Sequence, residues 1–235
     1  MKPLRSWAER LARTPFHPQW LLGERRPPKG IDQTRGTILD IGAADRWMER
    51  RLHPEAQYVA LDYPATGHHL YGARPDVFAD AARLPFRSDG FDGVVCLEVL
   101  EHVPDPAQVV CEIARVLKPG GRAWISMPFL YPLHDAPFDF QRYTEFGLRR
   151  DVSRAGLEVV SLEKSGHAVR TAGLLASLAI AGAAHARRGS IAAIAWLPMA
   201  AVLVLLVNLT AFVMSLVWPD WSHLAMGHEA QVRKP

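Results

Sequence analysis

The sequence predicts a doubly wound α/β fold, in which helices cover both faces of a mostly parallel sheet. Three observations predict it. Short apolar runs alternate with helical segments from residue 37 onward, a glycine-containing turn follows the first run, and acidic residues end successive runs. The 235 residues are enough for one sizeable domain of this class and an appendage.

Six apolar runs are predicted strands. They cover residues 37–42, 58–63, 76–81, 91–99, 122–128 and 157–163. Segments with helical periodicity separate several of them, and these are 45–52, 105–117 and 145–156. The sequence Lys-Pro-Gly-Gly at 118–121 is a stop signal for the second helix, just before the next strand.

The first 30 residues are basic. Leu4, Trp7 and Leu11 recur on one stripe of a predicted amphipathic helix over 3–13, which could pack on the domain or lie on a membrane. The basic side chains that could attract anionic headgroups are Lys2, Arg5, Arg10, Arg13, Arg25, Arg26 and Lys29. A solvated helix face is the equal alternative, and residues 23–36 are predicted to be a linker.

Charge and cysteine content exclude some classes of protein. A net charge of +3 does not call for a nucleic-acid groove, so no nucleic-acid partner is predicted. Cys96 and Cys111 lie inside apolar runs without metal or redox spacing. We therefore predict no metal site and a reducing, cytoplasmic compartment.

The turn after the first strand is the first candidate site. Gly42 lets the chain turn sharply while its backbone approaches a ligand. Asp62 ends the second strand about 20 residues later, the spacing at which a carboxylate can accept hydrogen bonds from a ribose. Asp80 follows the third run and could bind an adenine amino group. For each acid, the alternative is that it only caps the next helix.

The charge of this turn indicates which nucleoside binds. The turn lacks the later glycines that a pyrophosphate needs, and Asp45 places a carboxylate where a phosphate would lie. This disfavours a nicotinamide-dependent reductase. It suits a cofactor with an ammonium group and a sulfonium, with Asp40 facing the ammonium end.

Residues 37–165 resemble the class I S-adenosylmethionine-dependent methyltransferases of the small type called type 11. The matching segments are ILDIGAAD (38–45), YVALD (58–62), DAARLPFRSDGFDGVV (80–95), LEVLEHVPDP (97–106) and EIARVLKPGGRAWISMP (112–128). The resemblance implies a seven-stranded Rossmann-like sheet with S-adenosylmethionine as cofactor. The residues that it implies are Asp40 and Gly42 near the methionine end, Asp62 at the ribose, Asp80 and Ala81 at the adenine, and Leu97 and Glu98 at the pocket floor. Ala44 departs from the family, which usually has glycine there.

Residues 128–144 are the predicted acceptor loop, which faces the sulfonium. His134 is a candidate general base, with Asp135 or Asp139 to orient it. Methyl transfer needs mainly in-line positioning, so the alternative is that no base is used. Arg142 and Tyr143 are candidate acceptor-site residues, or a structural latch in which Arg142 pairs with one of the two aspartates. His102 is expected to cap or support its helix.

An apolar insertion follows the sixth strand. Residues 191–217 hold no charge over 27 positions, which is enough to cross a bilayer, and 171–186 are also uncharged. The tail 226–235 resembles the last, antiparallel strand of the family, so the insertion is predicted to be a helical hairpin with both ends on the cytoplasmic side. Arg187 and Arg188 at its tip favour a shallow over a spanning hairpin. The non-membrane alternative is a buried dimer face.

The predicted organisation has four parts. They are a basic segment and linker at 1–30, a methyltransferase domain at 31–166, a membrane-associated insertion at 167–222 and the last strand at 223–235. The predicted function is methylation of a hydroxyl or carbon atom on a small or lipid-linked acceptor at the membrane surface, with membrane lipids as partners. The alternative is an inactive, nucleoside-binding scaffold on the membrane, and the sequence specifies no oligomeric state.

Overall fold

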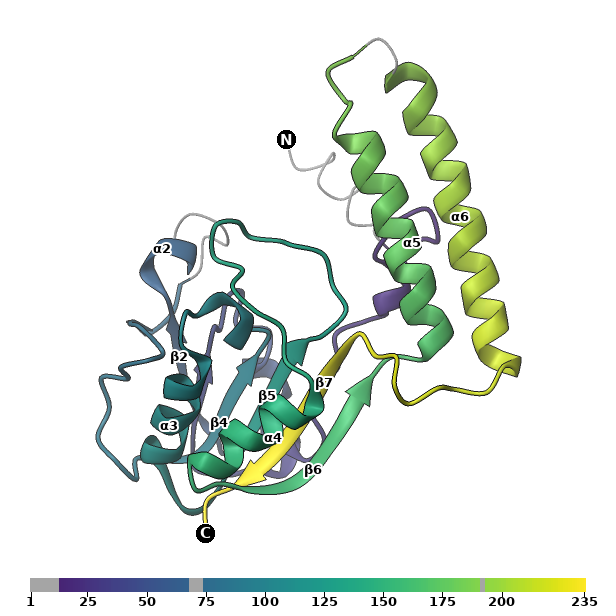
Figure 1. Cartoon of the computed structure of the whole chain (residues 1–235). Helices are drawn as coiled ribbons and strands as arrows, with labels where there is room; N and C mark the ends of the chain where they lie inside the picture. The colour runs from purple at the N-terminus through teal and green to yellow at the C-terminus, as the bar shows by residue number, and fades with distance from the viewer. Residues whose placement is uncertain (1–12, 68–73, 191–192) are drawn as a thin grey trace. The chain divides into compact units, whose positions relative to one another are not determined.

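The computed structural model describes residues 13–67, 74–190 and 193–235, which form two compact units. The described residues of the sheet unit are 26–67, 74–129, 133–164 and 227–235. The described residues of the hairpin unit are 13–25, 130–132, 165–190 and 193–226. In Figure 1 the strand labels mark the sheet unit, and the labels α5 and α6 mark the hairpin unit.

A seven-stranded sheet forms the sheet unit, in the order β3-β2-β1-β4-β5-β7-β6 (Figure 1). The strands are β1 (Thr37–Ile41), β2 (Gln57–Asp62), β3 (Val77–Phe78), β4 (Phe91–Leu97), β5 (Leu117–Pro128), β6 (Glu158–Ser165) and β7 (Gly227–Arg233). Neighbours from β3 to β5 are parallel, and β7 is antiparallel to β5 with Ile125 opposite Ala230. The predicted doubly wound sheet with an antiparallel last strand is confirmed.

Two predicted helices of the sheet unit are present as α3 (Pro106–Val116) and α4 (Glu145–Arg154). Each has a side-chain cap. Asp105 accepts a hydrogen bond from the backbone N–H of Gln108, and Thr144 accepts one from Gly147. The shorter elements are α2 (Pro64–Thr66) and the 3-10 helices η1 (Trp20–Leu22), η2 (Ile31–Gln33), η3 (Glu49–Arg51) and η5 (Leu100–His102).

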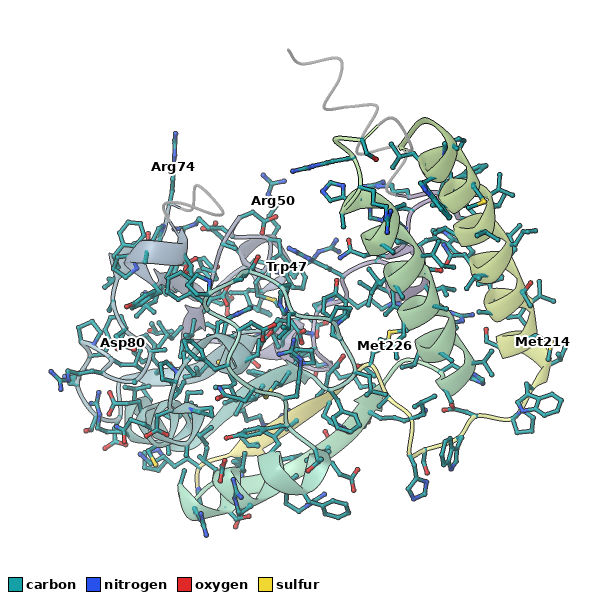
Figure 2. The ribbon with its side chains drawn as sticks, turned by 45° about the horizontal axis from the view of Figure 1, so that its top comes forward. Trp47, Arg50, Arg74, Asp80, Met214 and Met226 are labelled. Carbon is teal, nitrogen blue, oxygen red and sulfur yellow. The ribbon has the colours of Figure 1, made fainter. Side chains whose placement is uncertain are left out.

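The predicted helix over 45–52 was wrong. The segment is a series of turns that ends in η3. Arg46 has a φ of 57°, and a right-handed helix cannot contain a left-handed residue. Met48 is 1% exposed and packs with Ile38 and Val95, so burial of an apolar side chain holds the turns in place without a helix. Trp47, labelled in Figure 2, also packs against this cluster.

Two strand limits also differ from prediction. Of the predicted strand 76–81, only Val77 and Phe78 form strand β3, and they pair with Leu61 and Asp62 of β2. Strand β5 begins at Leu117, directly after α3, so the Lys-Pro-Gly-Gly stop signal lies inside the strand. A register shift between Phe91 and Gly93 of β4 accommodates these residues.

The two faces of the sheet have different apolar cores. Leu39 and Val94 face a large cluster that includes Val109 and Ile113 of α3 and Leu148 of α4. The alternate side chains face a smaller cluster of Ile31, Ile38, Met48, Val95 and Trp124. Successive side chains of a strand point to opposite faces of the sheet. The burial of both sets therefore fixes the face on which each side chain of β1 and β4 lies.

The hairpin unit consists mainly of α5 (Ala168–His185) and α6 (Ala193–Val217), which lie side by side in Figure 1. Both are long and apolar enough to cross a membrane by length and composition, with mean hydropathies of 1.3 and 2.5 in their apolar stretches. The predicted helical hairpin is confirmed. The predicted amphipathic helix over 3–13 lies almost entirely outside the described residues.

Two polar side chains are buried inside the hairpin. The hydroxyl of Ser177 donates to Oδ1 of Asn208 at 2.8 Å, and both side chains are fully buried. The amide of Asn208 donates to the carbonyls of Pro15 and His17 at 2.7 and 2.9 Å. These bonds tie the segment before η1 to α6, which keeps all of these polar groups satisfied in an apolar surrounding.

Candidate functional site

The sequence-predicted cofactor residues lie at one edge of the sheet unit. The carboxyl ends of parallel strands meet at the same edge of a sheet. Asp40 lies near the end of β1, Asp62 ends β2, and Leu97 ends β4 with Glu98 directly after it. Asp80 follows β3 by two residues, and Phe78 of β3 is paired with Asp62. The fold thus places all three acids at or just after the carboxyl ends of neighbouring strands.

The turn after β1 is built for close packing. Gly42 has a φ of 75°, and a Cβ there would lie 2.4 Å from Cγ2 of Val99. The backbone N–H groups of Gly42 and Ala43 both donate to the carbonyl of Leu61, at 2.9 and 3.1 Å. The turn is therefore fixed against β2, and only glycine fits at its first position without displacing Val99.

Left-handed residues continue along this turn without glycine. Ala44 has a φ of 44° and Arg46 one of 57°, so every second residue from Gly42 is left-handed. The Arg46 guanidinium forms ion pairs with Glu49 and Asp76, at 3.1 and 3.0 Å. It also lies 5.0 Å from the centre of the Tyr58 ring. The ion pairs and the cation–π contact of Arg46 thus help to hold a left-handed backbone conformation that only glycine adopts without strain.

Asp40 is 5% exposed, and its Oδ2 accepts a hydrogen bond from the hydroxyl of Tyr58. Burial raises the pKa of Asp40 to about 7, while the hydrogen bond from Tyr58 opposes this shift and the charge of Asp62 adds to it. A carboxylate in such a position stabilises a bound cation and repels an anion.

Asp62 is also 5% exposed, and burial raises its pKa. Its Oδ2 accepts the backbone N–H of Ala44 at 2.9 Å, and its Oδ1 accepts that of Tyr63 at 2.8 Å. A carboxylate can accept about four hydrogen bonds, so two acceptor positions remain beyond these backbone contacts.

The remaining predicted cofactor residues differ in environment. Asp80, labelled in Figure 2, is exposed and accepts the backbone N–H of Ala82 at 2.9 Å, while Ala81 is buried. Glu98 has a φ of 54°, and its Oε1 accepts the hydroxyl of Ser126 at 2.7 Å. The serine partner of Glu98 was not predicted from the sequence.

The acceptor loop is docked on η5. The side-chain amide of Gln141 donates to the carbonyls of Leu100 and Val103 at 2.6 Å each, and the backbone N–H of Phe140 donates to the carbonyl of Glu101 at 2.8 Å. The loop residues from 133 onward thus lie against the segment that follows β4.

Asp139 is the partner of both His134 and Arg142. The Nδ1 atom of His134 lies 3.2 Å from Oδ2 of Asp139, whose side chain is 3% exposed. The Arg142 guanidinium donates to both carboxylate oxygens, and it holds the pKa of Asp139 well below its usual range. A carboxylate kept ionised in this way can orient the imidazole of His134.

A second histidine and an acid complete this group. The His102 ring lies 4.8 Å from the His134 ring, edge to face, and its Nδ1 is 2.7 Å from the carbonyl of Phe138. Glu101 is fully buried, and its two carboxylate oxygens have no hydrogen-bond partner in the part of the chain that the structure describes. Its Oε1 lies 3.6 Å from Nε2 of His102. Glu101 was missed from the sequence, where the only signal is an acid next to a histidine after a strand.

The hydrogen bond of Tyr143 is made to α4 and not to the histidine group. Its hydroxyl donates to Asp151 of α4, and its ring packs against the larger apolar core. This geometry matches the alternative of a structural latch better than an acceptor contact.

Comparisons with known proteins agree with this architecture. Residues 39–125 match the family model described as a methyltransferase domain. A ubiquinone biosynthesis O-methyltransferase from Marinobacter nauticus is 38% identical over 90 residues, which are 38% of this chain and 33% of that protein. A 27-O-demethylrifamycin SV methyltransferase from Amycolatopsis mediterranei is 38% identical over 97 residues, covering 41% and 34% of the two chains. Over residues 39–125 this chain is thus similar to methyltransferase domains, and it spans about a third of the length of these two relatives.

Solved structures share the fold. A methyltransferase from Methanosarcina mazei matches with a TM-score of 0.53 and 14% identity, over 90% of this chain and 99% of that one. A protein from Galdieria sulphuraria that is provisionally named a sarcosine dimethylglycine methyltransferase matches with a TM-score of 0.52 and 16% identity. The match covers 87% of this chain and 79% of that one. At these identities the likeness shows the fold alone.

Proposed function

We propose that this chain is an S-adenosylmethionine-dependent methyltransferase that methylates a hydroxyl group of an amphiphilic acceptor at a membrane surface. The observation that carries the proposal is the pair of buried carboxylates, Asp40 and Asp62, at the ends of neighbouring strands within the matched domain. Buried acids at this edge favour a cationic nucleoside over a phosphate-bearing one.

The residues of the edge fit S-adenosylmethionine. Asp62 holds the ribose hydroxyls with its remaining acceptor positions, and Asp40 with Gly42 lies at the methionine end, where the ammonium balances the buried charge. The other contacts are the backbone at Ala44, Asp80 and Ala81 at the adenine, and Leu97 with Glu98 beneath it. The cofactor supplies a methyl group on a positively charged sulfur.

The acceptor side is the His134–Asp139 pair. Asp139 holds the proton on Nδ1 of His134, so Nε2 is the nitrogen that takes the proton of an acceptor hydroxyl. Arg142 keeps Asp139 ionised for this role. An oxygen acceptor is proposed over carbon because the Marinobacter relative is an O-methyltransferase by name, and the Amycolatopsis relative is named for a 27-O-demethyl compound.

The hairpin attaches the protein to the inner face of a membrane. Apolar side chains of α6 are exposed, among them Leu206 at 55% and Leu216 at 64%, as expected of a surface that lies in lipid. Strands β6 and β7, which flank the hairpin in the chain, belong to one sheet, so both ends of the hairpin lie on the same side of the membrane. Arg187 and Arg188 near its tip favour a hairpin that enters one leaflet.

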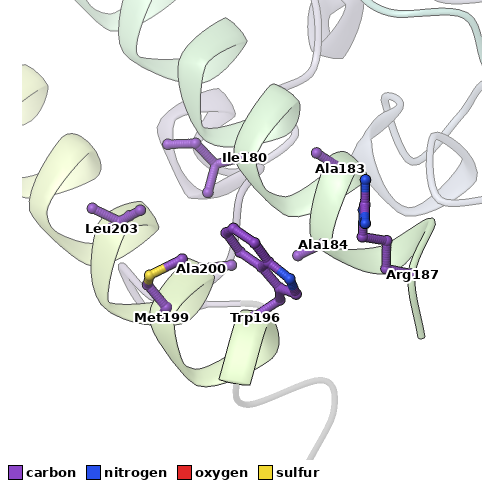
Figure 3. A pocket seen from close by; sticks show the side chains of 8 residues that line it. All are labelled: Ile180, Ala183, Ala184, Arg187, Trp196, Met199, Ala200 and Leu203. Carbon is purple, nitrogen blue, oxygen red and sulfur yellow. The ribbon is translucent and has the colours of Figure 1, made fainter. Parts of the chain in front are cut away.

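A pocket of about 350 Å³ between the helices supports a lipid partner (Figure 3). Apolar side chains such as Ile180, Trp196 and Leu203 line it, and Arg187 lies at its α5 end. An acyl chain fits the apolar lining, and the guanidinium suits the phosphate of its headgroup.

Two measurements on the full, detergent-purified chain test the proposal. Calorimetry should detect S-adenosylmethionine binding, and S-adenosylhomocysteine should form when a lipid extract is added. Cofactor binding without any methyl transfer to lipid or small-molecule extracts would favour the inactive scaffold, which the non-glycine residues Ala44 and Arg46 make the second candidate. Absence of cofactor binding would contradict both.

A further inference from the structure

We infer that Glu101, His102 and His134 bind one divalent transition-metal ion of the Zn²⁺ type beside the acceptor site. One ligand atom from each residue lies within 4.8 Å of the other two. The inference does not need the proposed methyl transfer to be correct, because ion binding can be measured alone.

The buried acid is the first argument. Glu101 is fully buried, and among the described residues neither of its carboxylate oxygens has a hydrogen-bond partner. A buried carboxylate without a partner costs several kcal/mol, so native proteins pair such groups or use them as metal ligands. The Nε2 atom of His102 lies 3.6 Å from Oε1 of Glu101. Ligands of a tetrahedral ion with bonds of about 2.1 Å lie about 3.4 Å apart, which is close to this distance.

The tautomers of both histidines are the second argument. The Nδ1 of His102 lies 2.7 Å from the carbonyl of Phe138, which can only accept, so Nδ1 carries the proton and Nε2 has the lone pair. The Nδ1 of His134 faces the ionised carboxylate of Asp139 at 3.2 Å, which directs its lone pair to Nε2 in the same way. An outer oxygen that accepts from the far ring nitrogen is the usual support of a metal-bound histidine.

The ligand set indicates which ion binds. Two imidazoles and one carboxylate are the ligands of many catalytic zinc sites, which keep a fourth position open, whereas Mg²⁺ prefers oxygen ligands only. The carboxylate of Asp135 lies 3.9 Å from Nε2 of His102 and is close enough to orient a molecule at the open position.

An ion here changes the role of His134. With the ion bound, Nε2 of His134 would be a ligand and could not take a proton, so the ion would replace the general base of the proposed function by lowering the pKa of the acceptor hydroxyl. The hydroxyl proton then passes to solvent, the oxygen bonds to the methyl carbon, and the carbon–sulfur bond breaks with its electron pair returning to sulfur.

The test is metal binding by the chelator-treated full chain. Calorimetry should give one Zn²⁺ per chain with at least tenfold weaker Mg²⁺ binding, and Co²⁺ should give the visible absorption of a four-coordinate ion. Glu101→Gln, His102→Ala and His134→Ala should each weaken Zn²⁺ binding by more than about 100-fold, since even outer-shell changes cost roughly 10- to 100-fold. Asp139→Asn should fall within that outer-shell range.

His53→Ala and His223→Ala are the matched controls, because these histidines lie outside the group and should leave the Zn²⁺ affinity unchanged. Circular dichroism shows which variants keep the fold, and Glu101→Gln is the variant of choice because it keeps the size of the side chain. The inference is overturned if the wild-type chain binds no stoichiometric Zn²⁺, or if folded Glu101→Gln binds it equally well. Methyl transfer that persists in a chelator would overturn the role of the ion in the reaction while leaving the proposed function intact.

Discussion

His134 and Asp139 are joined twice. The backbone N–H of His134 donates to Oδ2 of Asp139 at 2.9 Å, and Nδ1 of its ring lies 3.2 Å from the same oxygen. One carboxylate therefore holds both the backbone of the acceptor loop and the orientation of the imidazole.

Asp139→Asn should reduce turnover by about 100-fold or more while leaving the affinity for S-adenosylmethionine unchanged. The amide can still accept the backbone N–H, but its NH₂ group no longer favours the proton on Nδ1. Steady-state kinetics and calorimetry measure the two effects. Glu145→Gln, at a partly exposed acid that begins α4, is the control, and full turnover of the Asp139 variant would remove the orienting role.

Asp62→Ala should weaken S-adenosylmethionine binding by about 100-fold or more, because hydrogen bonds to a charged group contribute about 1.5–3 kcal/mol each. Asp80→Ala should have a smaller effect, of about tenfold, since Asp80 is exposed. Calorimetry on both variants compares them with Asp32→Ala, an exposed acid of η2 that should bind as the wild type does. Unchanged affinity in the folded Asp62 variant would refute the ribose contact.

Asp40 should make the stability of the cofactor-free protein depend on pH. Its pKa is about 7 in the folded protein and near 3.8 when exposed, so between these values the unfolded chain releases a proton that the folded chain keeps. The free energy of unfolding should thus fall as pH rises through this interval, by up to a few kcal/mol. Asp40→Asn should lose this part of the pH dependence, measured by urea unfolding. Parallel curves for the two proteins would contradict the raised pKa.

Gly42→Ala should destabilise the sheet unit by about 2–4 kcal/mol, because the new Cβ meets Val99 at 2.4 Å and the residue has a left-handed φ. Gly156→Ala is a matched control with a φ of 79° and no atom within 4 Å of the new Cβ. It should show only the backbone strain, about 1 kcal/mol. Equal losses in urea unfolding would mean that contact with Val99 contributes nothing.

Aspartate at two exposed positions of α6, Leu206→Asp with Val213→Asp, should reduce binding to vesicles. Each charge costs about 2.5–3.5 kcal/mol at the centre of a membrane helix, and less near the surface. Flotation with vesicles that contain anionic lipid measures the bound fraction. Val160→Asp, at an exposed apolar residue of β6, should float like the wild type. Undiminished flotation of the double variant would place the anchor elsewhere, for example in the basic segment 1–30.

The sequence by itself determined the sheet and its edge of acids. Alternating apolar runs and helical segments predict a parallel sheet, and parallel strands bring their carboxyl ends together, so Asp40 and Asp62 could be placed at one edge without a structure. The hairpin followed in the same way from a long uncharged stretch between two strands of one sheet.

Only the tertiary structure decided which side chains meet across the loops. Glu101 is buried because Gln141 and Phe140, about 40 residues later, bond to the backbone around it and bring His134 beside His102. The turns at 45–52 likewise depend on contacts from Arg46 to Asp76, 30 residues away. Periodicity along the chain reports the local backbone and its buried face, whereas burial of a polar group depends on contacts between distant segments, which no local pattern contains.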